Sequence, residues 1–161
     1  MDGLSIAMIT EEERKLLLKD LSARLPYGVQ CSCTWSHEVP NGTTGCVQEL
    51  STFLIDEIEI MDNPEYDCQI CDVKPYLRPM SSMTEEELKE LNDKYGDIAY
   101  FFIQDPPYYH GLQAQHSDIG SIEISEFSEI YDWLNAHHFD YRGLIERGLA
   151  LEAPEGMYEI K

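Results

Sequence analysis

The sequence is poor in basic residues. Its 161 residues include 11 lysines and arginines against 31 aspartates and glutamates, which gives a formal net charge of −20 at pH 7. A field of this sign repels nucleic-acid phosphates and anionic membrane surfaces, so we expect no direct binding to either. It favours a basic partner or divalent cations, while acidity that only keeps the protein in solution is the simpler interpretation.

Long apolar runs and targeting signals are also missing. No segment approaches the roughly 20 apolar residues that span a bilayer. Residues 1–9 hold an aspartate at position 2, no basic residue and only a short apolar run, which is unlike a signal peptide. We therefore expect a cytoplasmic protein whose five cysteines, an odd number, are reduced.

The recognisable motifs of catalysis are absent as well. The chain contains no phosphate-binding loop, no G-x-G-x-x-G and no nucleophile in a recognisable setting. Paired carboxylates are frequent, as in "EEER" and "TEEE", but they arise by chance in so acidic a chain and suit the first turns of helices. We therefore predict no enzyme activity and no cofactor.

The apolar content, at 43% of residues with 11% aromatic, is sufficient for a hydrophobic core. We predict one domain over residues 1–161. A helix over residues 10–25 begins with Thr10 as N-cap and Glu13 closing a capping box. Period-two patterning, as in "VQCSCTW", then predicts a strand-rich segment over residues 29–73.

The second half of the chain alternates extended and helical patterns. The prolines of "KPYLRPMSSM" predict a connector, and "TEEE" repeats the capping-box pattern at the start of a helix, both within residues 74–96. A buried strand, a long surface loop and a partner strand in "SIEIS" occupy residues 97–125. Residues 126–150 are helical, after Ser125 as the cap.

These elements together predict an α+β fold. A small antiparallel sheet, which we compare to a partly open SH3-like barrel, packs against the N-terminal helix and the helical C-terminal third.

Four of the cysteines form two closely spaced pairs, Cys31-x-Cys33 and Cys68-x2-Cys71. If the strands that carry them are neighbours, four thiolates would converge as a tetrahedral zinc site requires. The first pair lies on a straight strand, however, and cysteine is an ordinary buried strand residue. We favour buried thiols over zinc.

The segment "PPYYHGLQAQHSDIG" offers surface candidates. Tyr108 and Tyr109, on a proline-stiffened loop, supply contact area for another protein unless both rings fold back onto the domain. His110 and His116 have metal-ligand chemistry, but a solvated polar loop is the commoner setting for such residues. We predict Tyr108, Tyr109 and His110 as binding residues.

The stretch "DWLNAHHFDYRGLIERGLALEAP" places His137, His138, Asp140 and Arg142 close together. One interpretation is a metal or enzyme site. The other is structural, with both histidines extending the packed stripe at the end of a helix that includes Trp133. Arg142 is the residue that structure explains least, and it either pairs with a carboxylate or is available to a partner.

Caps account for the rest of this stretch. Asp140 is the expected N-cap of a short helix over residues 141–146, with Phe139 and Leu144 forming a hydrophobic staple across its start. Gly148 then ends the helix in a Schellman motif. We predict that Leu144 takes part in both features, the hydrophobic staple and the Schellman motif.

Three blocks, "LLLKDLSARLPYGV", "KPYLRPMSSMTEEE" and "DWLNAHHFDYRGLIERGLALEAPEGMY", cover somewhat under half of the chain. In these blocks the chain resembles a family of small, uncharacterised acidic proteins encoded by gut Bacteroidales and their phages or other mobile elements. The resemblance implies a bacterial or phage cytoplasmic setting and one folding unit, with no established activity, cofactor or catalytic residue. It also implies that residues 30–73 and 97–125 differ among members.

We therefore expect a non-enzymatic protein-binding or accessory protein of a bacterial or mobile-element system. One alternative is an acidic mimic of nucleic acid that blocks a basic DNA-binding protein, which the net charge motivates. The other is a metal-binding protein or enzyme that uses His137, His138 and Asp140, or the cysteines.

Overall fold

The computed structural model describes residues 9–36, 44–52, 69–95 and 124–159. Within these ranges the chain forms three α-helices and a four-stranded sheet, which confirms the α+β class. The elements are α1 (Glu11–Arg24), η1 (Leu25–Tyr27), β1 (Gln30–Ser36), β2 (Thr44–Glu49), β3 (Gln69–Leu77), η2 (Met80–Ser82), α3 (Glu85–Tyr95), α5 (Ile124–Ala136) and β4 (Leu151–Glu152). In none of these ranges is a helix long and apolar enough to cross a membrane.

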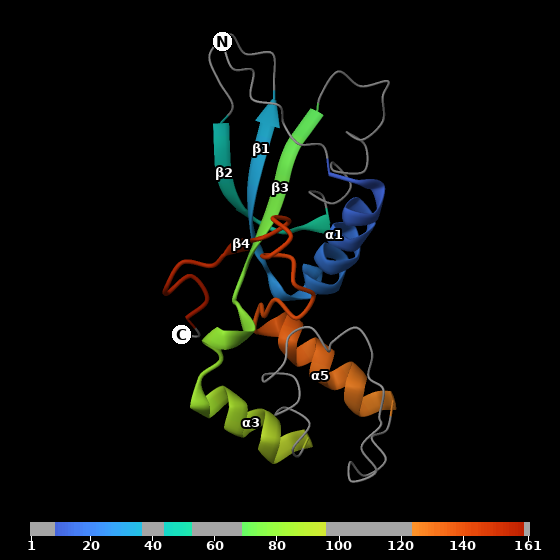
Figure 1. The fold of residues 1–161 in the computed structure, drawn as a ribbon. Helices are drawn as coiled ribbons and strands as arrows, with labels where there is room; N and C mark the ends of the chain where they lie inside the picture. Colours follow the sequence, from blue (N-terminus) through green and yellow to red (C-terminus); the bar gives the residue numbers. More distant parts are fainter. Residues whose placement is uncertain (1–8, 37–43, 53–68, 96–123, 160–161) are drawn as a thin grey trace.

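The sheet is open and has the strand order β2-β1-β3-β4 (Figure 1). β1 is antiparallel to β2 and to β3, as the sequence predicts. β4 joins β3 in parallel, so the complete sheet is mixed rather than antiparallel. The reason is connectivity, because the chain between β3 and β4 includes α3 and α5, and a crossover of this kind returns a strand in parallel. Both helices lie beyond one end of the sheet, while α1 lies beside it (Figure 1).

Both predicted capping boxes are present. At α1 the Thr10 hydroxyl accepts from the amide of Glu13, while the Glu13 carboxylate accepts from the amide of Thr10. Thr84 and Glu87 make the same reciprocal pair at α3. These bonds satisfy amide groups that the first turn of a helix leaves without partners.

The start of α5 differs from the prediction. The helix begins at Ile124, so Ser125 lies inside it and is not its cap. The last two residues of "SIEIS" are therefore helical rather than part of a strand. The helical spacing of the apolar residues that follow outweighed the strand propensity of Ile124, since strand propensity is strongly dependent on context.

The segment after α5 also differs, because residues 141–146 form turns and not a helix. Gly143 has a φ of 69°, which a right-handed helix does not accommodate. The predicted staple is not the organising contact either, since Phe139 and Leu144 belong to different hydrophobic clusters. Asp140 is therefore not the N-cap of a helix, and its carboxylate instead accepts hydrogen bonds from the amides of Leu144 and Ile145, four and five residues further along the chain.

Two Schellman motifs follow one another along the chain, the first at the end of α5 and the second at Gly148. At the end of α5 the amide of Phe139 donates to the carbonyl of Leu134, and His138 takes the left-handed conformation with a φ of 60°. Ten residues later the amide of Leu149 donates to the carbonyl of Leu144, with Gly148 at 71°. In each motif the two bonded residues share a hydrophobic cluster, as Schellman endings favour. The Schellman ending predicted at Gly148 is thus confirmed.

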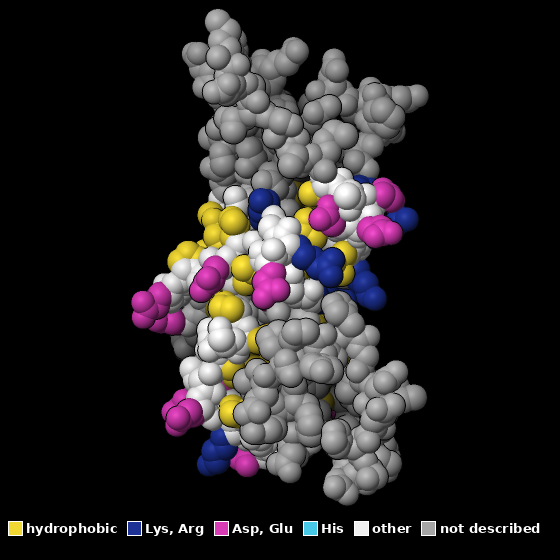
Figure 2. Space-filling model, viewed as in Figure 1, with side chains coloured by type: hydrophobic (Ala, Val, Ile, Leu, Met, Phe, Trp, Pro, Cys, Tyr) yellow, Lys and Arg dark blue, Asp and Glu magenta, His cyan; other side chains and the backbone are white. Residues whose placement is uncertain are grey.

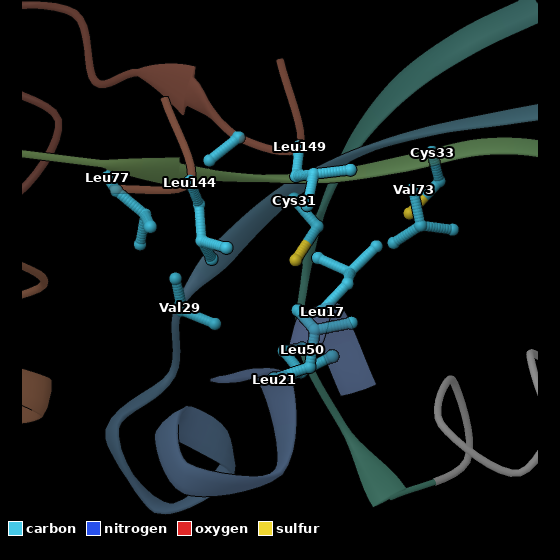
Figure 3. Close-up of a cluster of buried hydrophobic side chains, with 11 residues drawn as sticks. Leu17, Leu21, Val29, Cys31, Cys33, Leu50, Val73, Leu77, Leu144 and Leu149 are labelled. Atoms are coloured by element: carbon cyan, nitrogen blue, oxygen red, sulfur yellow. The ribbon is translucent and has the colours of Figure 1, made fainter. Parts of the chain in front are cut away.

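The core beneath the sheet joins four parts of the chain (Figure 3). Side chains from α1, from β1 and β3, and from the C-terminal segment point toward one another there. Its buried members are Leu17, Leu21, Val29, Cys31, Cys33, Leu50, Val73, Leu77, Leu144, Leu149 and Ala150. A second cluster joins α3 and α5 through Met80, Leu91, Tyr95, Ile130, Leu134, Phe139 and Tyr141.

Tyr158 completes the ladder between β1 and β3. Its hydroxyl accepts from the amide of Gln30 at 3.0 Å and donates to the carbonyl of Tyr76 at 2.8 Å. Because Cys31 stands opposite Pro75, the hydroxyl occupies the place of the next rung. Burial raises the pKa of Tyr158 to about 12, so the hydroxyl keeps the proton that it donates.

We predict that Leu144→Ala lowers the free energy of unfolding by about 2–5 kcal/mol, because it opens a cavity where a fully buried side chain joins the core to a Schellman closure. His137→Ala should cost less, about 0.5–1.5 kcal/mol, since its half-buried ring contributes mainly by stacking on Trp133. Urea unfolding of both variants checks the order, and equal losses would contradict it.

Candidate functional site

The strongest concentration of charge inside the described part of the protein is an ion pair on α1. Asp20 and Arg24 both have side chains with no exposed surface. Nε of Arg24 donates to one carboxylate oxygen of Asp20 at 2.7 Å, and Nη2 donates to the other at 3.1 Å. Burying two charges is costly unless their partners are close and hydrogen-bonded, and this bidentate geometry provides two such bonds. Among the described residues, Nη1 of Arg24 has no hydrogen-bond partner.

Arg24 also fixes the segment that follows α5. Its Nη2 donates to the carbonyl of Phe139 at 2.7 Å, over a separation of 115 residues in the chain. Its guanidinium lies 5.5 Å from the centre of the Tyr141 ring. One buried cation therefore connects α1 to both sides of Asp140.

Arg142 reaches the same carboxylate from the other side. Its Nε lies 3.2 Å from Oδ1 of Asp20, although the two are not aligned for a hydrogen bond. Its Nη2 donates to the hydroxyl of Tyr141 at 2.9 Å, and that hydroxyl donates to Asn135 at 3.0 Å. Of the two alternatives for Arg142, the structure thus shows pairing with a carboxylate.

Asp140 turns its carboxylate toward the backbone. Both oxygens accept amide hydrogen bonds, from Leu144 at 2.8 Å and from Ile145 at 2.9 Å. Burial is the main cause that raises the pKa of Asp140, and the two amide bonds act against that rise. This carboxylate holds a turn together and does not face its neighbour His138 as a metal ligand would.

His138 is buried and stacks on Tyr158 with ring centres 3.8 Å apart. Its backbone carbonyl accepts from the amide of Arg78, and the amide of Asp140 donates back to the carbonyl of Arg78. Burial, with the charge of Arg24 nearby, lowers the pKa of His138 to about 4. The ring is therefore neutral at pH 7, and among the described residues its Nδ1 has no hydrogen-bond partner.

His137 and Trp133 belong to the other side of the helix end. Their rings stack with centres 3.8 Å apart, and Nδ1 of His137 donates to the carbonyl of Trp133 at 2.9 Å in the tautomer that this contact requires. Nε1 of Trp133 donates to Glu90 on α3. His137 and His138 therefore point into different contacts, so they do not form one site.

The cysteine prediction is resolved in part. Cys31 and Cys33 are buried on the core face of β1, and burial raises the pKa of the Cys31 thiol to about 12. Within the described ranges no group of three or more residues could hold a metal ion. Cys68 lies outside these ranges, and the side chain of Cys71 is not described.

Tyr108, Tyr109 and His110 lie outside the described residues. Their predicted role in binding therefore stays a prediction.

Sequence reasoning missed Asp20 and Arg24, although a signal was present. The two residues share the helical stripe of Leu17 and Leu21, at spacings of three, four and seven residues. Charges on the apolar stripe of an amphipathic helix indicate a buried pair, since solvated charges belong on the opposite face. The partner at residue 142 is 122 positions further along the chain and has no comparable local signal.

Comparison of the chain with protein-family models, with curated proteins and with solved structures gives no match. The resemblance to proteins of gut Bacteroidales and their mobile elements therefore stays a prediction.

We predict that Asp20→Asn lowers the free energy of unfolding by about 3–5 kcal/mol, because it leaves the Arg24 cation buried without a counter-charge. The double variant Asp20→Leu with Arg24→Met should lose clearly less than the sum of its single substitutions. A double-mutant cycle measured by urea unfolding tests this.

The matched control is the exposed pair Lys15–Glu11, which has the same spacing on the same helix. Replacing Glu11 by Gln should change stability far less, since solvent screens that pair. If the losses in unfolding free energy at Asp20 and Arg24 were additive, the two residues would not act as a coupled buried pair. Equal losses for the buried and the exposed pair would also contradict the prediction.

His138 predicts a dependence of stability on pH. The unfolded state takes up a proton below the ordinary pKa of 6.5, while the folded state stays neutral down to about 4. Between these values the unfolded state binds more protons, so the free energy of unfolding should fall by about 2–3 kcal/mol as the pH drops from 6.5 to 4. The stabilisation is complete above pH 6.5.

His138→Asn is the test variant, because Asn tolerates the left-handed backbone but does not titrate. The raised pKa of Asp140 acts in the opposite direction near pH 4, and it remains in both proteins. The difference between the two proteins therefore isolates His138. Parallel stability curves over this pH range would overturn the prediction.

Proposed function

We propose that the protein acts by binding another protein, of basic character, and not by catalysis. The observation that carries this proposal is that the polar side chains of the stretch from His137 to Arg142 contact other parts of the fold. Asp140 accepts backbone amides, Arg142 pairs with Asp20, and His138 is buried and stacked. Among the described residues, the side chains of the His-Asp-Arg stretch thus contact other parts of the fold, which favours a function exerted through the surface.

Charge supports a basic partner. A net charge of −20 attracts a basic protein over a distance and raises the rate of its association. Figure 2 shows acidic and basic side chains interspersed over the described part of one face. An interspersed pattern favours recognition of a protein surface over mimicry of the continuous charge rows of a nucleic-acid backbone.

The expected result of capture from a bacterial lysate with the full chain is a distinct basic protein that is retained at about 0.15 M salt. About 1 M salt should release it, because screening weakens contacts between exposed charges. An unrelated folded protein with the same net charge is the control.

Recovery of nothing beyond this control would contradict the proposal. A captured DNA-binding protein that added duplex DNA displaces would instead favour the nucleic-acid mimic.

A further inference from the structure

β2 lies at an edge of the sheet that the described residues form. Among the described residues β2 pairs with β1 alone, so one of its sides faces away from the sheet. Three consecutive residues near its end, Val47, Gln48 and Glu49, are exposed. Val47 is 54% exposed. Open edges of this kind are templates for pairing with another strand.

The register shows which groups are available. The amide of Leu50 donates to the carbonyl of Val29 at 2.7 Å, so this pair is hydrogen-bonded. Hydrogen-bonded and non-bonded pairs alternate in an antiparallel ladder. Val47 and Glu49 stand opposite Ser32 and Gln30, one step out of phase. Their N–H and C=O groups therefore point outward.

The side chains along this edge give it a chemical preference. Residues 45, 47 and 49 share one face of the strand, because side chains alternate. Val47 offers an exposed apolar contact, and Glu49 is exposed and acidic. An added strand would match this face with an apolar residue opposite Val47 and a basic residue opposite Glu49.

We propose that β2 binds an extended, basic segment of a partner protein by strand addition. Backbone hydrogen bonds at Val47 and Glu49 supply affinity, and the apolar and basic pair across the edge supplies selectivity. The proposal rests on the proposed function and names its surface. A second copy of the chain is a poorer occupant, because each copy has a charge of −20 and antiparallel self-pairing about Val47 sets Glu49 against Gly45.

The probe is a nine-residue peptide in which lysine and valine alternate with threonine. Its control has glutamate in place of each lysine. Titration of the isotopically labelled full chain, followed by amide NMR shifts, should show the lysine peptide moving the signals of Val47 and Glu49 first. The glutamate peptide should bind at least tenfold more weakly.

Two variants test the edge itself. Val47→Pro removes an outward amide without removing a ladder bond to β1, and it should weaken binding of the lysine peptide at least tenfold. Val47→Lys is the second variant, in case proline disturbs folding, and it should have the same effect. Gln48→Lys is the matched control, since it adds the same charge at a residue whose amide faces β1 and should leave most of the binding intact.

Equal binding by wild type and both Val47 variants, or no shift at millimolar peptide, would overturn the edge proposal. The lysate capture would then still report separately on whether the protein binds a basic partner. A dimer in sedimentation that the Val47 variants abolish would also overturn it, because the occupant would then be a second copy of the chain.

Discussion

Asp20 and Arg24, fully buried on the inner side of α1, form the interaction on which the position of the C-terminal segment depends. The pair cannot be exposed to water without moving α1, and Arg24 cannot lose the carbonyl of Phe139 without leaving a donor buried. A buried ion pair of this kind adds little stability compared with an apolar pair of equal volume. Its geometry instead selects one arrangement, because any other places a charge in the core without a partner.

The two Schellman motifs make this arrangement compact. Each reverses the chain within a few residues, and each places an apolar side chain in a cluster beneath the turn. Between them Asp140 caps a glycine-containing turn, and Arg142 returns to Asp20. The ten residues from Phe139 to Gly148 are thus held at both ends by backbone bonds and in the middle by charge.

Local rules predicted local features well. Both capping boxes, the glycine closure at Gly148 and the buried position of Leu144 follow from a few neighbouring residues, and the structure contains each. The predicted helix over residues 141–146 was wrong because a single glycine with positive φ outweighed a favourable helical pattern. The parallel strand β4 and the pairing of Asp20 with Arg142 depend on distant segments, for which one sequence contains no pattern.

The contacts that hold the segment after α5 also bear on what its side chains can do chemically. A stretch with two histidines, an aspartate and an arginine suggests chemistry, yet each of these side chains contacts another part of the fold. Among the described residues, Nδ1 of His138 and Nε of Arg142 have no hydrogen-bond partner. A catalytic group must be free to contact a substrate, whereas a capping carboxylate or a stacked ring is already engaged. In the described part of the sheet β2 and β4 form the two edges, and β2 is the longer of the two strands. Because backbone atoms recognise other backbones, an open edge strand is where the proposed partner segment would bind, and the net charge favours a basic one.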